Sequence, residues 1–168
     1  PSIRVQSAPS TEGRPQKEKK EGDFACLEHP EGFQRAPDGR IFVNIADTKV
    51  VQVIQPGGET HATWPLPDGL SHNFPLCLDY AGGRVFVGCR RPSSCVVVYR
   101  INDGSVVATV PCAGDMDDLY YDQKRSRLYV LGGEGRISVI STSKTQFEVI
   151  STVASSIGAR TGLWYTNR

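Results

Sequence analysis

Short apolar runs alternate with polar turns along most of this chain. The clearest stretch is 114–140, where an acidic start leads into apolar runs at Leu119–Tyr121, Arg127–Leu131 and Arg136–Ile140. A polar turn and a glycine-rich turn separate these runs. Valine, isoleucine and aromatic residues in runs of this length predict β-strands joined by tight turns. Helical periodicity is missing along the chain, so we expect almost no helix.

The same plan occurs upstream at a fixed spacing. Three apolar triplets, each preceded by an arginine, begin at Ile41, Val85 and Leu128, which are 44 and 43 residues apart. A β-rich repeat of this length predicts a propeller blade of four antiparallel strands. The sequence therefore predicts an all-β fold built from incomplete propeller-type blades.

The repeat also divides the chain into predicted parts. Blades are expected at about 29–66, 73–110 and 114–153, and a fourth is expected to start at 158, with its first strand at 162–165. Residues 1–22 combine both charges with proline and glycine and contain no large apolar cluster, which predicts a flexible charged tail. Residues 23–27 are expected to form a short strand that completes an earlier blade. The partial propeller domain thus spans 23–168.

About three blades leave a sheet face without a neighbour at each end of the arc. The side chains expected to be exposed there are Phe33, Phe42 and Val53 at one end and Tyr129, Ile137 and Trp164 at the other. Exposed apolar patches of this kind are rare on soluble monomers. We therefore expect a homo-oligomer, or pairing with a missing half of the propeller.

The repeats resemble a known family. The stretches that carry the resemblance are HPEGFQRAPDGRIFVNIADTKVVQVI, NFPLCLDYAGGRVFVGCRRP, GDMDDLYYDQKRSRLYVLGGEGRISVI and GARTGLWY, which together cover about 29–165. As a set they look like the bacterial YVTN-repeat β-propeller proteins. The resemblance implies a propeller, commonly of about seven blades, which is often periplasmic or secreted and usually has no assigned reaction. This chain differs because three blades would not close such a ring.

Charge and length exclude several classes of partner. The 168 residues include 19 Lys and Arg against 18 Asp and Glu, which gives a net charge of +1. The chain has no strong electrostatic field that would favour binding to nucleic acid. No apolar run approaches the ~20 residues of a membrane span. We expect neither nucleic-acid binding nor membrane insertion. The chain shows no signal-peptide pattern, so its compartment follows only from the family resemblance.

The five cysteines contain no CxxC pair. Cys89 and Cys95 flank a loop between two strands that should pair. Two interpretations are open: a cross-strand disulfide, or small buried residues with free thiols.

Candidate chemistry lies where the inner strands begin, because the innermost strand of each propeller blade lines the central channel. The first residues there, His29, Asn73, Met116 and Arg160, are 44, 43 and 44 residues apart. The candidate ligand-binding residues at and beside these positions are His29, Glu31, Asn73, Asp117, Asp118 and Arg160. Oxygen donors of this kind suit Ca²⁺ or Mg²⁺, and an arginine can hold a carboxylate or phosphate. The structural alternative is that these groups cap strand ends and pair with Arg160.

Known catalytic motifs such as GxSxG, the P-loop and HExxH are absent. The sequence therefore predicts a non-enzymatic binding or interaction module that presents loops around a channel mouth to a protein or small-molecule ligand, without a cofactor. One alternative is a lactonase-like hydrolase, similar to the gluconolactonase group of propellers. In that case Glu31, Asn73 and Asp117 would bind Ca²⁺ or Mg²⁺ and Asp118 would act as base. A second alternative is a fragment of a larger propeller without independent activity.

Overall fold

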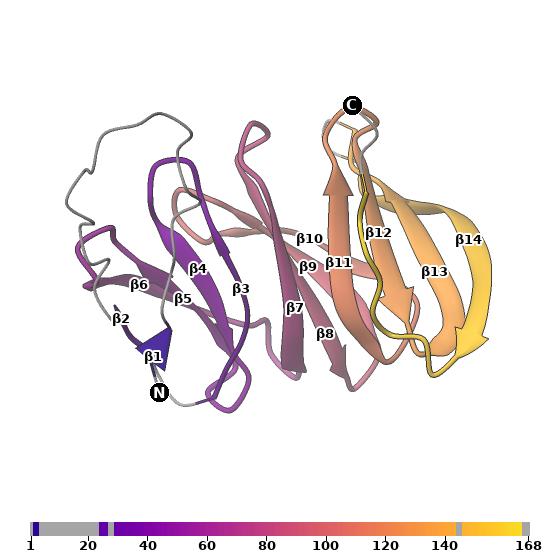
Figure 1. Ribbon diagram of the computed structural model, residues 1–168, viewed down its shortest axis with the longest axis horizontal. Coiled ribbons are helices and arrows are strands. Elements are labelled where there is room, and N and C mark those ends of the chain that lie inside the picture. Colours follow the sequence, from indigo (N-terminus) through magenta and orange to yellow (C-terminus); the bar gives the residue numbers. More distant parts are fainter. Residues whose placement is uncertain (1, 4–23, 27–28, 144–145, 166–168) are drawn as a thin grey trace, which may run out of the picture.

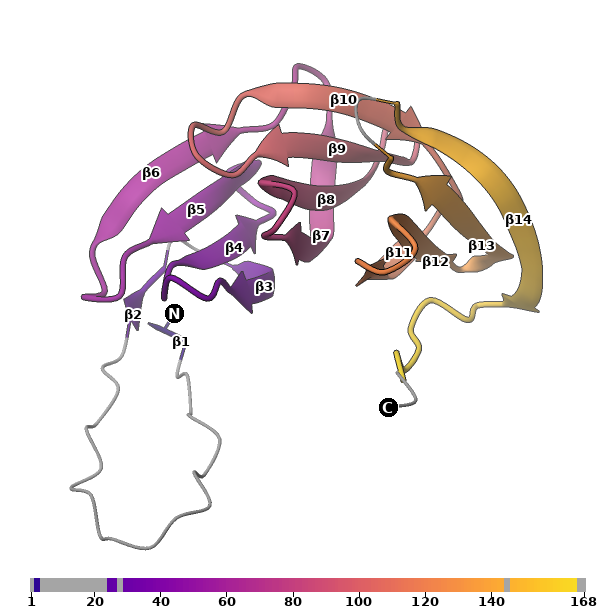
Figure 2. The same cartoon turned by 90° about the horizontal axis from the view of Figure 1, so that it is seen from above.

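Three four-stranded antiparallel sheets form an open arc, and a separate sheet of two short strands lies beside it (Figures 1 and 2). The computed structural model describes residues 2–3, 24–26, 29–143 and 146–165. Each of the three sheets has four strands, and the described residues contain no helix. The arc does not close into a ring. The predicted all-β fold with incomplete propeller-like blades is therefore confirmed.

Each blade is a meander in which neighbouring strands are consecutive in the chain. Blade one contains β3 (Pro30–Arg35), β4 (Ile41–Ile45), β5 (Val50–Ile54) and β6 (Thr60–Pro65). Blade two contains β7 (Ser71–Asp79), β8 (Arg84–Arg91), β9 (Cys95–Arg100) and β10 (Val106–Pro111). Blade three contains β11 (Met116–Asp122), β12 (Arg127–Gly132), β13 (Glu134–Ser141) and β14 (Glu148–Ile157). The inner strands β3, β7 and β11 lie next to one another on the concave side of the arc (Figure 2).

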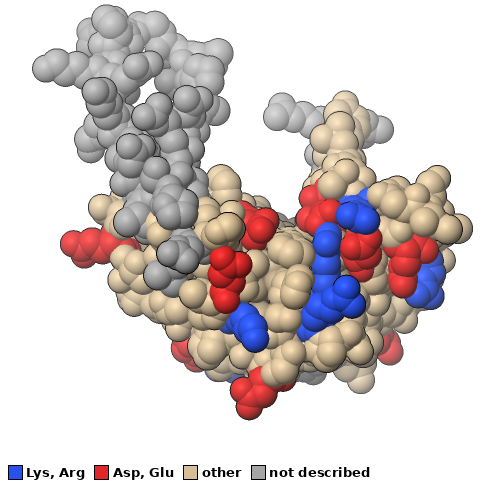
Figure 3. All heavy atoms as spheres, turned by 90° about the horizontal axis from the view of Figure 1, so that it is seen from below, with Lys and Arg blue, Asp and Glu red and all other residues tan. Residues whose placement is uncertain are grey.

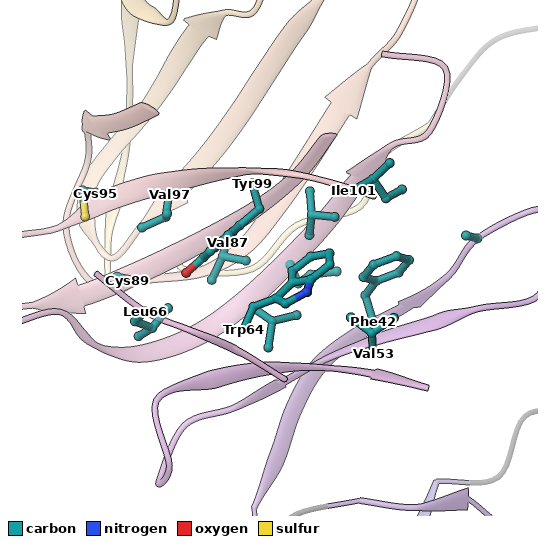
Figure 4. Packing of buried hydrophobic residues seen from close by; sticks show 14 residues of the cluster. Phe42, Val53, Trp64, Leu66, Val87, Cys89, Cys95, Val97, Tyr99 and Ile101 are labelled. Carbon is teal, nitrogen blue, oxygen red and sulfur yellow. The ribbon is translucent and has the colours of Figure 1, made fainter. Parts of the chain in front are cut away.

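Blades one and two share an apolar core. Trp64 lies between Phe42 of the same blade and Tyr99 of blade two, with ring centroids 5.6 and 5.8 Å apart (Figure 4). The Tyr99 hydroxyl donates a hydrogen bond to the Pro65 carbonyl at 3.1 Å, and burial raises the pKa of this phenol. Phe42 and Val53 are fully buried here. Their predicted exposure at a free end was wrong, because residue alternation does not say which sheet face meets the neighbour.

Blades two and three share a second core of the same kind. Phe86 of β8 is fully buried and lies 5.3 Å from the ring of Tyr121 in β11. Val96 and Val98 of β9 pack in the same cluster as Leu128 of β12. Blade two is therefore packed on both faces.

The other face of blade one is covered as well. Ile41, Val43, Ile45 and Ile54 are almost fully buried, and Cys26 packs against them. Next to this face, β1 (Ser2–Ile3) pairs with β2 (Phe24–Ala25) in a two-stranded sheet (Figure 2). The strand expected within 23–27 therefore forms, but it pairs with β1 instead of completing a blade of four strands. Ser2–Ile3 were expected to belong to the tail, and the rest of 1–22 lies outside the described residues.

The other face of blade three meets the segment that follows β14. The Trp164 ring lies 5.0 Å from Tyr129 and 6.2 Å from Tyr120. The strand expected at 162–165 does not form. Its backbone bonds to side chains of blade three: the Gly162 N–H donates to the Asp118 carboxylate at 2.9 Å, and the Gly162 carbonyl accepts from Tyr120. A strand needs a backbone partner, and no second strand lies beside this segment within the described residues.

A residue with left-handed backbone geometry lies at the start of each inner strand, directly before β3 and β11 and at the second residue of β7. His29, His72 and Asp115 have φ of 50°, 59° and 56°, and Gly158 continues the series at 85°. These positions are spaced 43 residues apart throughout. Aspartate and histidine are among the non-glycine residues that tolerate this region best. The structural repeat thus begins one residue before Asn73, which was predicted as a first position.

The turn between the first and second strand of each blade has a left-handed residue too. Gly39 and Gly83 fill this position in blades one and two, and Ser126 fills it in blade three with φ of 50°. The N–H of the residue after the third strand donates to this carbonyl, at 2.9 Å from both Ile101 to Gly83 and Thr142 to Ser126. The left-handed conformation is thus required in blades two and three, and Ser126 of blade three adopts it at a cost in conformational free energy.

We predict that Ser126→Gly stabilises the protein by about 1 kcal/mol, since a left-handed conformation costs a residue with a Cβ roughly 1–2 kcal/mol and glycine almost none. The free energy of unfolding in urea measures this change. The matched control is Ser151→Gly in the exposed strand β14, which should be destabilising by about 0.5–1 kcal/mol. Destabilisation by both substitutions would show that the turn carries no strain.

Candidate functional site

A hollow of about 480 Å³ opens on the concave side of the arc, between the inner strands. Phe33 and Gln34 of β3 and Leu78 of β7 line it on one side, and Asp118 of β11 lines it on the other, with Trp164 at the edge. The inner strands are held in place because side chains of β7 and β11 are buried in the two cores between blades. The packing of one blade on the next therefore positions the inner strands and so forms the hollow.

The lining combines apolar rings with fixed polar groups. Phe33 is 47% exposed, which is unusual for a large apolar side chain. The Gln34 side chain accepts a hydrogen bond from the Leu78 N–H at 2.8 Å, which links the inner strands of blades one and two. Apolar walls with a few oriented polar groups are typical of small-molecule sites.

Asp118 holds the far wall of the hollow. Its Oδ2 accepts hydrogen bonds from the Tyr120 hydroxyl at 3.0 Å and from the Gly162 N–H at 2.9 Å. Burial and the hydrogen bond to Asp118 raise the pKa of Tyr120. The Tyr120 phenol therefore stays protonated and links Asp118 to the segment that carries Trp164.

Arg90 organises the start of β11 next to the hollow. Its Nε donates to the Met116 carbonyl at 2.7 Å, its terminal nitrogen bonds to the Asp117 carboxylate, and its guanidinium lies 4.6 Å from the centre of the Phe74 ring. Only 17% of the Arg90 side chain is exposed. Three aspartates lie at the start of β11, and their need for a neutralising cation is the signal in the sequence that could have identified Arg90.

Asp115 extends this cluster to the far end of the described chain. It lies 3.3 Å from Arg90 and its other carboxylate oxygen lies 2.7 Å from the Arg160 Nε. Asp115 was not among the predicted site residues, although its repeat position matches His29 and His72. The expected role of Arg160 as an ion-pair partner is therefore seen, with Asp115 as the carboxylate.

The six predicted site residues do not form one group. Asp117, Asp118 and Arg160 lie around the start of blade three, whereas His29 and Glu31 are exposed on blade one. His29 lies 3.6 Å from Asp47. Among the residues that the structure describes, no three His, Cys, Asp or Glu side chains are placed to share a metal ion.

Asn73 has a structural position between blades. It is fully buried, and its Nδ2 donates to the Val50 carbonyl at 3.0 Å and to Asn44 at 3.4 Å. Asn44 in turn donates to the carbonyls of Phe74 and Pro75 at 3.1 and 2.9 Å. These bonds connect blade two to blade one, so Asn73 does not face the channel mouth as predicted.

Charged side chains of both signs are interspersed on the face shown in Figure 3. No broad region of one sign is visible there. This distribution agrees with the net charge of +1. The described residues contain no helix of the length and apolarity needed to cross a membrane.

The five cysteines are free thiols, and Cys89 lies directly opposite Cys95 in the β8–β9 ladder. A hydrogen bond with Cys95 and burial raise the pKa of Cys89. Burial also raises the pKa of Cys77, and it raises that of Cys112 to about 12. The structure matches the interpretation as small buried residues.

We predict five reactive thiols in denaturant without reductant, counted with Ellman's reagent. In the folded protein at about pH 8, Cys77, Cys89 and Cys112 should react slowly, because a raised pKa lowers the fraction of reactive thiolate. Reduced protein provides the control. A count of three in denaturant that rises to five after reduction would establish a disulfide instead.

We predict that calcium chloride leaves the melting temperature unchanged. Asp117 is paired with Arg90 and Asn73 is buried between blades, so neither is arranged as a ligand for the expected Ca²⁺ or Mg²⁺. An ion that binds the native state must raise the melting temperature. A rise that Asp117→Ala removes and Asp47→Ala retains would contradict this expectation and support the hydrolase alternative.

Comparisons with known proteins support the fold alone. Neither a protein-family model nor a curated protein sequence matches the chain. Hydrazine synthase of Kuenenia stuttgartiensis is similar over 81% of this chain and 38% of its own, with a TM-score of 0.69 and 14% identity. A protein of unknown function from Bacteroides caccae is similar over 83% of this chain and 52% of its own, with a TM-score of 0.59 and 14% identity. The chain thus spans about half the length of these proteins or less. The likeness supports a propeller-like fold, and the resemblance to the YVTN-repeat family stays a prediction.

Proposed function

We propose that this chain is a non-enzymatic, propeller-type binding module whose ligand occupies the hollow between the inner strands. The observation that carries the proposal is the exposed Phe33 ring facing a hollow of about 480 Å³. Sites for small molecules have volumes of about 300–1,000 Å³ and combine apolar walls with a few oriented polar groups. The size and lining of this hollow fit that description.

The fixed geometry of the walls favours recognition. Asp118 is held by Tyr120 and Gly162, and Gln34 is held by the Leu78 N–H. Groups that are already oriented lose little conformational freedom when a ligand binds. Phe33 and Trp164 add flat apolar surface beside these polar groups. We infer a ligand with one apolar face and several hydrogen-bonding groups, such as a sugar or a short peptide segment.

The carboxylates near the hollow support binding in preference to catalysis. Asp117 is neutralised by Arg90, and Asp118 accepts hydrogen bonds from Tyr120 and Gly162. A general base needs a carboxylate oriented toward the reacting proton. These two carboxylates instead hold the start of β11 and the segment that bears Trp164.

Tryptophan fluorescence tests the proposal directly. Trp64→Phe keeps an aromatic ring in the core and leaves Trp164, at the hollow, as the only tryptophan. We expect at least one member of a panel of methyl glycosides, capped dipeptides and gluconolactone to change its fluorescence saturably. Phe33→Ala in this background should weaken that binding about tenfold or more, whereas Tyr80→Ala, an exposed aromatic outside the hollow, should not.

Three results would overturn the proposal. If no compound in the panel changes Trp164 fluorescence, or if Phe33→Ala and Tyr80→Ala bind equally, the hollow is not the site. Conversion of gluconolactone that Asp118→Asn abolishes would show an enzyme, and NMR spectra of the recovered compounds detect it.

A further inference from the structure

Two of the five cysteines face each other next to the loop of the β8–β9 hairpin. Cys89 and Cys95 are direct partners in this antiparallel ladder, so their side chains lie on the same face of blade two. Both belong to the core between blades one and two, where they lie at the same end of the cluster (Figure 4). Directly opposite residues have Cα atoms roughly 4.5–5.5 Å apart, and a disulfide spans about 4.4–6.8 Å. The backbone therefore holds this pair where a disulfide can bridge it.

The repeat does not require cysteine at these two positions. Ile45 precedes Cys89 by 44 residues, and Gly132 follows it by 43. The ladder partner of Ile45 in blade one is Val50, and that of Gly132 in blade three is Arg136. An aliphatic pair is thus sufficient to pack this part of a blade. Packing alone therefore does not account for two facing thiols in blade two.

The other three cysteines lie on different faces of the blades. Cys77 and Cys112 pack in the core between blades two and three, and Cys26 packs against the outer face of blade one. Cys89 and Cys95 are the two that lie together in the core between blades one and two. Each is therefore placed to react with the other.

The two thiols differ in reactivity. The hydrogen bond with Cys89 lowers the pKa of Cys95, whereas the same hydrogen bond and burial raise the pKa of Cys89. Cys95 is also slightly less buried, at 5% exposure against 0% for Cys89. Because the thiolate is the nucleophilic form of cysteine, Cys95 is the sulfur that reacts first with a small oxidant. Cys89 is then positioned to complete a bridge.

We propose that Cys89 and Cys95 form an oxidant-sensitive site, which hydrogen peroxide converts into a reversible disulfide within the chain. The Cys95 thiolate attacks one peroxide oxygen: an S–O bond forms, the O–O bond breaks, and the second oxygen leaves as hydroxide and takes up a proton to become water. The Cys89 sulfur then displaces the oxygen on Cys95, which forms the S–S bond and releases a second water with the Cys89 proton. Two thiols are oxidised, and one peroxide is reduced to two waters.

The disulfide fixes the base of the loop that carries Arg90. Arg90 directly follows Cys89, donates to the Met116 carbonyl at 2.7 Å, and forms ion pairs with Asp115 and Asp117. A cross-link between β8 and β9 beside Arg90 therefore keeps this side chain against the start of β11. The oxidation does not depend on the ligand of the proposed function.

Thiol counting and peptide mapping test the proposal. Folded protein is treated with hydrogen peroxide, catalase removes the excess, and Ellman's reagent counts the thiols in denaturant. The count should fall from five to three and return to five with dithiothreitol. Trypsin cleaves after Arg90 and so places Cys89 and Cys95 in separate peptides, 85–90 and 91–100. Without reductant, mass spectrometry should find these two joined, at their summed mass less two hydrogens.

Two variants separate this pair from the other thiols. Cys95→Val, which copies the equivalent residue of blade one, should keep its four remaining thiols after peroxide. Cys112→Ala removes a thiol of the other core and is the matched control, so its count should fall from four to two. Peroxide should also raise the melting temperature of the unmodified protein by a few degrees, because a cross-link restricts the unfolded chain, and should leave that of Cys95→Val unchanged. Far-UV circular dichroism verifies that each variant is folded.

Four results would overturn the proposal. A count that stays at five shows that the pair does not react, and a loss that dithiothreitol does not restore indicates sulfinic or sulfonic acid in place of a disulfide. A different pair of joined peptides, or chains linked to one another on a non-reducing gel, assigns the oxidation to other thiols. An unchanged or lowered melting temperature in the oxidised protein shows that the bridge does not fix the hairpin.

Discussion

The packing of one blade on the next is the interaction on which the rest of this structure depends. A four-stranded sheet cannot bury its own faces, and each repeat contacts only its neighbours. Trp64 lies between Phe42 and Tyr99 in one such core, and Phe86 is buried in the other. Full burial of a large apolar side chain contributes roughly 1.5–3 kcal/mol. Because blade two lies between these two cores, it holds the inner strands of all three blades in register and thereby forms the concave hollow.

The sequence was sufficient to predict the blades and insufficient to predict the contacts between them. The spacing of Ile41, Val85 and Leu128 predicted three four-stranded sheets, because strand length and turn residues are local properties. Phe42 was misplaced because alternation gives two faces without saying which one meets a neighbour. Asn73 was misplaced because a local repeat does not show that its side chain bonds across to blade one. The strand expected at 162–165 needed a backbone partner that local pattern cannot supply.

The candidate site was predictable only in part, for a related reason. Asp117, Asp118 and Arg160 do lie around the start of blade three, since they come from the starts of two successive repeats. The partner of Asp117 is Arg90, which reaches it from the adjacent blade. The aromatic lining joins Phe33 of blade one to Trp164, far along the chain. A surface assembled from three blades and the segment after the last one becomes visible only when the arc is formed.

Urea unfolding of Phe86→Ala tests the central claim most directly. If the core between blades two and three holds the arc together, this substitution lowers the free energy of unfolding by about 3–5 kcal/mol, as expected for a large aromatic removed from a packed core. Tryptophan fluorescence and far-UV circular dichroism should then report one shared transition for both the variant and the unmodified protein. A loss below about 1 kcal/mol, or separate transitions from the two probes in the unmodified protein, would show that the blades are stable independently and would contradict this account.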